Sequence, residues 1–243
     1  MKEESRIICR AEVAEVLALT HDVRELRLTL IDPPELFFRA GQFITIEVTE
    51  MHDGHLRQNN RPYSLASSPD EKGVIRLCVN QVGSGPGSTY LHALKSGDSF
   101  LFSSPIGFFT VNDEAASALL FIATGTGIAP IKSMIHHLLQ TGSRRAIRLY
   151  WGLRHEEDLY YQEELALWSE RYPHFQYVTT LSQPSSMWQG TRGRVTQLLP
   201  DAITVVDSVD AYLCGIGAMI KEVRSLLMAK GMPPKSIHFE KFY

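Results

Sequence analysis

The fold of this chain is decided by residues 118–130, which read ALLFIATGTGIAP. The apolar run Leu119 to Ala123 predicts a buried strand, and the pattern from Ile128 to Gln140 predicts a helix directly after the two glycines. Backbone N–H groups at the start of such a helix can hold a pyrophosphate, and glycines allow its close approach because they carry no Cβ. The stretch predicts a phosphate-binding turn, with a glycine-rich turn that binds nothing as the alternative.

This turn departs from the usual dinucleotide fingerprint. It reads G-x-G-x-x-P, so Pro130 stands where a third glycine is usual, in the first helical turn, where its missing N–H costs nothing. The fingerprint also expects an acid about 20 residues later for the ribose, but the next strand ends in Gly152, Leu153 and Arg154. A standard Rossmann NAD site is therefore disfavoured.

The alternation of strand and helix continues to the C-terminus. Further strands are expected at 146–151, 175–181, 211–214 and 236–239, and further helices at 159–171 and 218–230. This pattern predicts a parallel, doubly wound sheet. Upstream, short Val-, Ile-, Leu- and Phe-rich runs predict an antiparallel barrel or sandwich, with strands at 6–16, 23–30, 43–49, 74–80 and 99–102. The change of period predicts an antiparallel β-barrel domain over residues 1–113 and a Rossmann-like parallel-sheet domain over residues 114–243.

Composition excludes several classes of protein. Of the 243 residues, 44% are hydrophobic and 21% are charged, which suits two buried cores and not a disordered chain. The net charge of −3 lacks the basic surplus that nucleic-acid binding needs. No apolar run approaches the roughly 20 residues of a membrane span, and Met1-Lys2-Glu3-Glu4 does not resemble a signal peptide. We therefore expect a cytoplasmic protein without a membrane span or a nucleic-acid partner.

No metal site is predicted. The cysteines lie far apart at 9, 78 and 214, so a disulfide framework or a cysteine-rich cluster is excluded. The paired histidines at 52, 55, 136 and 137 are expected to be solvated, and the acids at 156–158 to complement a helix dipole. Any electron-carrying cofactor must be organic or belong to another protein.

Two motifs in the first domain predict an anionic, flat-ringed ligand. Arg61-Pro62-Tyr63-Ser64 combines a phosphate-pairing guanidinium, an aromatic ring and a hydroxyl, and strand alternation points Arg61 and Tyr63 to one side and Ser64 to the other. Downstream, the stretch from Gly85 to Leu91 offers glycines, a hydroxyl and a helix start at Ser88. The alternative is a strand with a surface arginine and an ordinary helix cap.

The order of these motifs resembles the ferredoxin–NADP reductase superfamily over nearly the whole chain, from Arg6 to Tyr243. The resemblance rests on Arg-x-Tyr-Ser, Gly-x-x-Ser-x-x-Leu, Gly-Thr-Gly-Ile-Ala-Pro, Cys-Gly before a helix, and a C-terminal Glu-x-aromatic. It implies an FAD-binding barrel followed by a nicotinamide-nucleotide domain.

In the barrel, the resemblance implies that Arg61 binds the FAD pyrophosphate, that Tyr63 packs on the isoalloxazine ring, and that Ser64 acts beside flavin N5. Further cofactor contacts are implied for Pro62, Val79, Asn80, Gly85, Gly87, Ser88 and Thr89. Many relatives carry Lys or Arg at the position of Asn80, so this chain lacks one positive charge there.

In the second domain, the resemblance implies that the pyrophosphate of the hydride donor lies at Thr126 and Gly127, and that Cys214 lies beside the nicotinamide. Glu240 is implied to position the nicotinamide or route protons. The set of implied contacts is completed by Gly125, Pro130, Gly215 and two C-terminal aromatics, Phe242 and Tyr243, either of which stacks on the flavin.

Three segments bear on the identity of the donor. NADPH-specific relatives place an arginine directly after the equivalent of Ser182, where this chain has glutamine. Arg154 and Arg194 match arginines of bacterial NADPH-using members. Against this, Trp188-Gln189-Gly190 followed by Gly193-Arg194-Val195-Thr196 resembles the NADH-using oxygenase reductases, so we expect NADH or mixed use of NADH and NADPH.

These features together predict a flavoprotein that takes hydride from NADH or NADPH onto FAD. Single electrons then pass to a separate carrier, namely a ferredoxin, a flavodoxin or an oxygenase component, because the chain has too few cysteines for a cluster of its own. A free flavin reductase and an electron-transfer subunit of a larger complex are the alternatives, and the sequence does not decide the oligomeric state.

Overall fold

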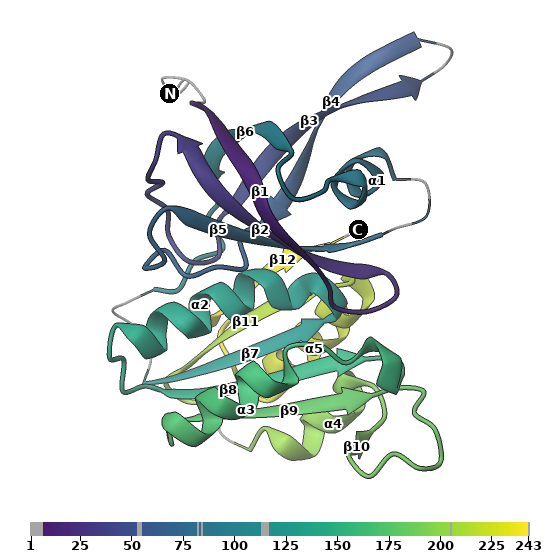
Figure 1. The fold of residues 1–243 in the computed structure, drawn as a ribbon. Coiled ribbons are helices and arrows are strands. Elements are labelled where there is room, and N and C mark those ends of the chain that lie inside the picture. The colour runs from purple at the N-terminus through teal and green to yellow at the C-terminus, as the bar shows by residue number, and fades with distance from the viewer. Residues whose placement is uncertain are drawn as a thin grey trace. The chain divides into compact units, whose positions relative to one another are not determined.

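A computed structural model describes residues 7–52, 55–81, 83, 85–112, 117–204 and 206–242 (Figure 1). Contacts divide the chain into two compact units. The first comprises Met1–Thr110 with Lys132–His137, and the second comprises Val111–Ile131 with Leu138–Tyr243. The predicted domain boundary, between residues 113 and 114, lies outside the described residues and stays a prediction.

The first unit is built on a curled antiparallel sheet, as predicted. Its strands are β1 (Ile8–Ala18), β2 (Val23–Asp32), β3 (Phe43–His52), β4 (His55–Ser64), β5 (Val74–Asn80) and β6 (Ser99–Ile106). They lie in the order β4-β3-β6-β1-β2-β5, and a bridge between Leu65 and Leu77 joins the segment after β4 to β5. The sheet therefore curls back on itself as a half-barrel, and helix α1 (Pro86–Ala93) follows β5.

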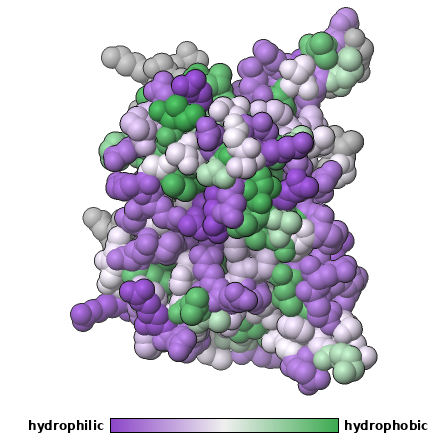
Figure 2. Space-filling view, viewed as in Figure 1, coloured by the Kyte–Doolittle hydropathy of each residue, from purple (hydrophilic) through white to green (hydrophobic). Residues whose placement is uncertain are grey.

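Alternating burial gives this sheet its core. In β1, for example, Cys9, Ala11 and Val13 are buried while their neighbours are exposed. The inner faces of the other strands supply Leu26, Leu28, Ile44, Ile46, Leu77 and Phe102 to the same cluster. On the surface, by contrast, hydrophilic residues cover most of the face in view (Figure 2).

The hairpin strand β4 is longer than its sequence suggests. Only its last residues carry the motif quoted above, and most of its side chains are polar and exposed, without the apolar alternation that marks a strand. Pairing with β3 over its full length holds it in place, from His52 opposite His55 to Phe43 opposite Ser64.

The second unit is a parallel α/β sheet, as predicted. Its strands are β7 (Ala118–Thr124), β8 (Ala146–Leu153), β9 (Phe175–Leu181), β10 (Thr191–Arg192), β11 (Val209–Gly215) and β12 (Ile237–Lys241). The helices are α2 (Ile128–Gln140), α3 (Gln162–Arg171), α4 (Val195–Ala202) and α5 (Gly217–Ala229), with short 3₁₀ turns η1 (Gly125–Gly127), η2 (Glu156–Asp158) and η3 (Pro234–Ser236).

The strand order of this sheet is β10-β9-β8-β7-β11-β12. The chain moves outward from β7 in one direction and then returns to build β11 on its other side. Ligands of open α/β sheets bind at the carboxyl ends of the strands where the order reverses. The turn after β7 and the end of β11 are therefore at the expected binding edge.

Among the described residues, no helix is long and apolar enough to cross a membrane.

Candidate functional site

Strand β4 places its motif on two faces. Arg61 pairs with Ile46 and Tyr63 with Ile44, and both isoleucines belong to the buried inner face. Ser64 pairs instead with Phe43 on the opposite face. The predicted separation of Arg61 and Tyr63 from Ser64 is confirmed.

The first turn of α1 lies against Arg61 and Tyr63. A Cβ on Gly87 would lie 2.4 Å from Tyr63 Oη and 3.0 Å from Arg61 Cγ, closer than packed atoms normally approach. A larger residue here would displace the Tyr63 side chain, so glycine allows this close approach. Two motifs separated by some twenty residues of sequence thereby converge on one cradle of guanidinium, phenol and backbone. A phosphate and a flat ring fit this donor set.

The predicted helix start at Ser88 is wrong, because α1 begins at Pro86. Proline is favoured at the first helical position, where its fixed φ suits the helix and its missing N–H has no partner to lose. Ser88 is buried in the first turn and its hydroxyl donates a 3.0 Å hydrogen bond to the carbonyl of Gly85. Thr89 is exposed, and its backbone N–H donates to the same carbonyl at 2.9 Å.

Several implied cofactor contacts have protein partners in this structure. The Arg61 guanidinium forms an ion pair with Glu50, although its side chain remains 35% exposed. Asn80 Nδ2 donates to Asp22 Oδ2 at 3.1 Å, so Asn80 is held by the turn that precedes β2. The carbonyl of Val79 lies 3.1 Å from His92 Nε2 of α1.

Thr45 is a buried polar residue beside the motif of β4 that the sequence did not suggest. It lies on β3 opposite Pro62, and its hydroxyl is buried without a hydrogen-bond partner among the described residues. Nothing in the sequence pattern distinguishes this threonine from other strand residues.

In the second unit, glycines allow the ends of β7 and β11 to meet. A Cβ on Gly127 would lie 2.4 Å from the Cys214 carbonyl oxygen, and one on Gly215 would lie 2.1 Å from Thr124 Oγ1. Gly125 has a φ of +52° with open space around its Cβ position. The turn is therefore shaped by backbone packing at Gly127 and by left-handed geometry at Gly125, which leaves the space beside Gly125 and the half-buried Thr126 for a ligand. Pro130 lies in the first turn of α2, as predicted.

Cys214 and Glu240 lie opposite each other on β11 and β12. Burial and the charge of Glu240 raise the pKa of the Cys214 thiol well above its usual range. Cys214 is fully buried and stays a neutral thiol at physiological pH. Phe242 follows β12, half-buried, and its N–H donates to the carbonyl of Gly215 at 2.8 Å, whereas Tyr243 lies outside the described residues.

The segments after β8 and β9 are tied together. The hydroxyl of Ser182 donates to the carbonyl of Leu153 at 3.2 Å, and the Gln183 N–H donates to the carbonyl of Arg154 at 2.8 Å. Arg154 and Arg194 are both exposed, and Arg194 precedes the first residue of α4. Neither arginine lines the cavity of about 940 Å³ that opens between these segments.

Comparison with known proteins identifies both halves of the chain. Residues 10–111 match the family described as oxidoreductase FAD-binding domain, and residues 121–225 match oxidoreductase NAD-binding domain. Ferredoxin–NADP reductase B of Sorangium cellulosum is 32% identical over 96% of both chains. The phenol hydroxylase P5 protein of Acinetobacter pittii is 33% identical over 96% of this chain and 65% of its own length. The structure of the Amycolatopsis cytochrome P450 reductase GcoB is 30% identical, with a TM-score of 0.83 over 98% of this chain and 70% of that one.

The fold, the cradle and these matches define the class of protein as an FAD- and NAD(P)H-dependent oxidoreductase. The chain belongs to the ferredoxin–NADP reductase superfamily. It spans nearly the whole of the Sorangium relative and about two thirds of the Acinetobacter one.

Proposed function

We propose that this protein takes hydride from a nicotinamide nucleotide onto FAD bound in its first unit and passes single electrons to a separate protein. The observation that carries the proposal is the approach of Gly87 to Arg61 and Tyr63, which builds one cradle from the two predicted flavin motifs. FAD supplies the ability to accept two electrons with a hydride and to release them one at a time.

In this proposal, Arg61 binds the FAD pyrophosphate and shares its charge between that group and Glu50. The Arg61 side chain is partly exposed, so a phosphate can reach it without breaking the ion pair. Tyr63 offers its ring from the inner face of the sheet, and its hydroxyl approaches the first turn of α1. Ser64 supplies a hydroxyl on the other face, toward the reacting edge of the flavin. The Pro62, Val79, Asn80, Gly85, Ser88 and Thr89 positions complete the proposed binding surface.

The second unit is proposed to hold the donor across the ends of β7 and β11. Backbone N–H groups at Thr126 and Gly127 bind its pyrophosphate at the start of α2. Cys214 is proposed to lie beside the nicotinamide as a neutral thiol. Glu240 lies across from it in register and positions the ring, and Phe242 or Tyr243 covers the flavin until the donor arrives.

The electron acceptor is proposed to be a ferredoxin, a flavodoxin or an oxygenase component. Relatives named as reductases of oxygenase systems support this choice, including the reductase component of a Pseudomonas putida naphthalene 1,2-dioxygenase system, which is 30% identical over 97% of this chain. Each donor molecule would then reduce two one-electron carriers. The three cysteines are buried and none of them forms a disulfide, as expected for the cytoplasm that we propose as the protein's location.

Gel filtration followed by a turnover assay tests the proposal. The protein should elute yellow and then oxidise the donor with ferricyanide as a one-electron acceptor, two ferricyanide ions per nucleotide, without added flavin. Loss of the colour together with a requirement for added FMN or FAD would contradict the proposal and favour a free flavin reductase.

A further inference from the structure

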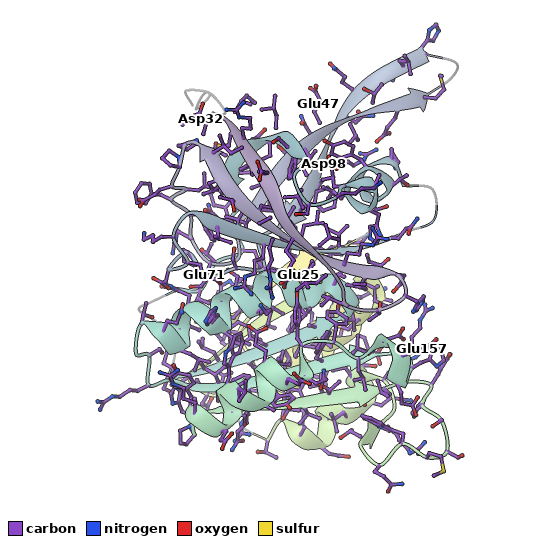
Figure 3. The ribbon with its side chains drawn as sticks, viewed as in Figure 1. Glu25, Asp32, Glu47, Glu71, Asp98 and Glu157 are labelled. Carbon is purple, nitrogen blue, oxygen red and sulfur yellow. The ribbon has the colours of Figure 1, made fainter. Side chains whose placement is uncertain are left out.

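A cavity of the second unit lies where the segments after β8 and β9 come together. It measures about 940 Å³ and is lined by residues 155–157 and by residues of the 183–190 segment. His155 Nδ1 lies 2.7 Å from the carbonyl of Gln183, which fixes one segment against the other. Figure 3 shows Glu157 on the segment that follows β8. The cavity is thus at the carboxyl edge of the sheet, where α/β folds bind nucleotides.

Glu156 is held rigidly at this cavity by Ser185. The Ser185 N–H donates to Glu156 Oε1 at 2.9 Å and to Oε2 at 3.2 Å, and its hydroxyl donates to Oε1 at 2.5 Å. These bonds lower the pKa of Glu156, the hydroxyl bond most of all. The carboxylate is therefore ionised at neutral pH, and Oε2 retains acceptor capacity for a further donor.

The acids at 156–158 do not share the single role that the sequence suggested. Asp158 accepts a 2.9 Å hydrogen bond from the N–H of His155 and so caps the short turn η2. Glu156 turns away from that role toward Ser185. Its partner is 29 residues further along the chain, which is why the sequence pattern did not reveal it.

The charge of the cavity lining is negative. Glu156 and Glu157 both line it, and none of its described lining residues is Lys or Arg. A phosphate group placed here would meet two carboxylates and no guanidinium or ammonium group. A hydroxyl would instead find an ionised acceptor, and hydrogen bonds to charged groups are the stronger ones.

Trp188 supplies the flat wall of the cavity. Its indole N–H donates to the carbonyl of Thr191 at 3.0 Å, and a Cβ on Gly190 would lie 2.3 Å from its ring. Glycine therefore allows the ring to lie against the backbone, with the side chain partly exposed toward the cavity. Such a surface suits a planar base.

We infer that this cavity binds the adenosine portion of the hydride donor and that Glu156 selects NADH over NADPH by accepting a hydrogen bond from the ribose 2′-hydroxyl. The inference rests on the proposed function. NADH is favoured because Arg154 and Arg194, the two residues that would pair with a 2′-phosphate, are exposed and lie outside the cavity lining.

Titration calorimetry on the FAD-loaded protein tests the inference without turnover, with 5′-AMP and 2′,5′-ADP as probes. Wild-type protein should bind 5′-AMP about tenfold to a hundredfold more tightly than 2′,5′-ADP, the range expected for one hydrogen bond to a charged group. Glu156→Gln should reduce this ratio at least tenfold. Glu163→Gln removes an exposed charge on α3, away from the cavity, and should leave the ratio unchanged.

Glu156→Asp is the charge-conserving control. It keeps the carboxylate and should keep the preference for 5′-AMP. Equal binding of the two probes by wild-type protein, binding of neither, or an unaltered ratio in Glu156→Gln would overturn the inference. The values of kcat/KM for NADH and NADPH with ferricyanide separate this outcome from failure of the proposed function. Turnover with an unaltered donor ratio in Glu156→Gln contradicts only the role of Glu156, whereas no turnover with either donor contradicts the proposed function.

Discussion

Substitution of Gly127 by alanine should destabilise the second unit more than any other single methyl group added to the turn after β7. The new Cβ would lie 2.4 Å from the carbonyl oxygen of Cys214, 2.6 Å from its carbonyl carbon and 2.8 Å from the nitrogen of Gly215. All three atoms belong to the backbone of β11, so no side chain can rotate to make room. Overpacking typically costs 1 to 3 kcal/mol, and we expect about 3 kcal/mol here because β11 itself must move.

Gly125→Ala is the matched control. Its Cβ would meet nothing within 4 Å, and only its φ of +52° opposes alanine, at a cost of about 1 kcal/mol. Urea unfolding followed by tryptophan fluorescence measures both variants in the right unit, since Trp151, Trp168 and Trp188 all belong to the second one. Equal losses of unfolding free energy in the two variants, or a loss below 1 kcal/mol for Gly127→Ala, would refute the packing argument.

Three further predictions concern the first unit. Ser64→Ala should retain FAD but slow its reduction by NADH by about a hundredfold to a thousandfold in stopped flow, the usual effect of losing one well-placed hydrogen-bond donor; an unchanged rate would exclude the proposed role. Arg61→Ala should weaken FAD retention through loss of a charge-assisted phosphate contact, measured as the FAD dissociation constant, and full loading of the variant would count against the assignment. Glu71 should stabilise the unit above pH 4.5: burial alone would raise its pKa, but the hydrogen bond from His136 and the charge of Arg76 lower it to about 2. A lowered carboxyl pKa gives stability that is lost as the pH falls toward that pKa. The free energy of unfolding, measured by flavin fluorescence, should therefore fall by about 2 kcal/mol between pH 5 and pH 3 in wild type and by markedly less in Glu71→Gln. Parallel pH profiles of the two proteins would contradict this.

The arrangement of the second unit could be predicted from sequence because its signals are local. The apolar run before Gly125 and the helical pattern after it lie within a few turns of one another, and β7 and α2 form as expected. The antiparallel half-barrel was also predictable, since the inner residues of β1 and β2 alternate with polar ones.

The features that were missed depend on tertiary contacts. The polar strand β4 is held by pairing with β3, and α1 begins two residues before Ser88 because Pro86 fits the first helical position. The bond between Glu156 and Ser185 joins two loops that follow different strands, so neither residue carries a local signal. The convergence of Gly87 on Tyr63 likewise becomes visible only when the sheet has closed.

The absorption spectrum of the purified protein, recorded anaerobically before and after addition of NADH, tests the central claim most directly. The account predicts the bands of bound oxidised flavin and their prompt bleaching by NADH, with slower or weaker bleaching by NADPH. A protein that retains no flavin after reconstitution with FAD, or whose bound flavin neither nucleotide bleaches, would contradict it.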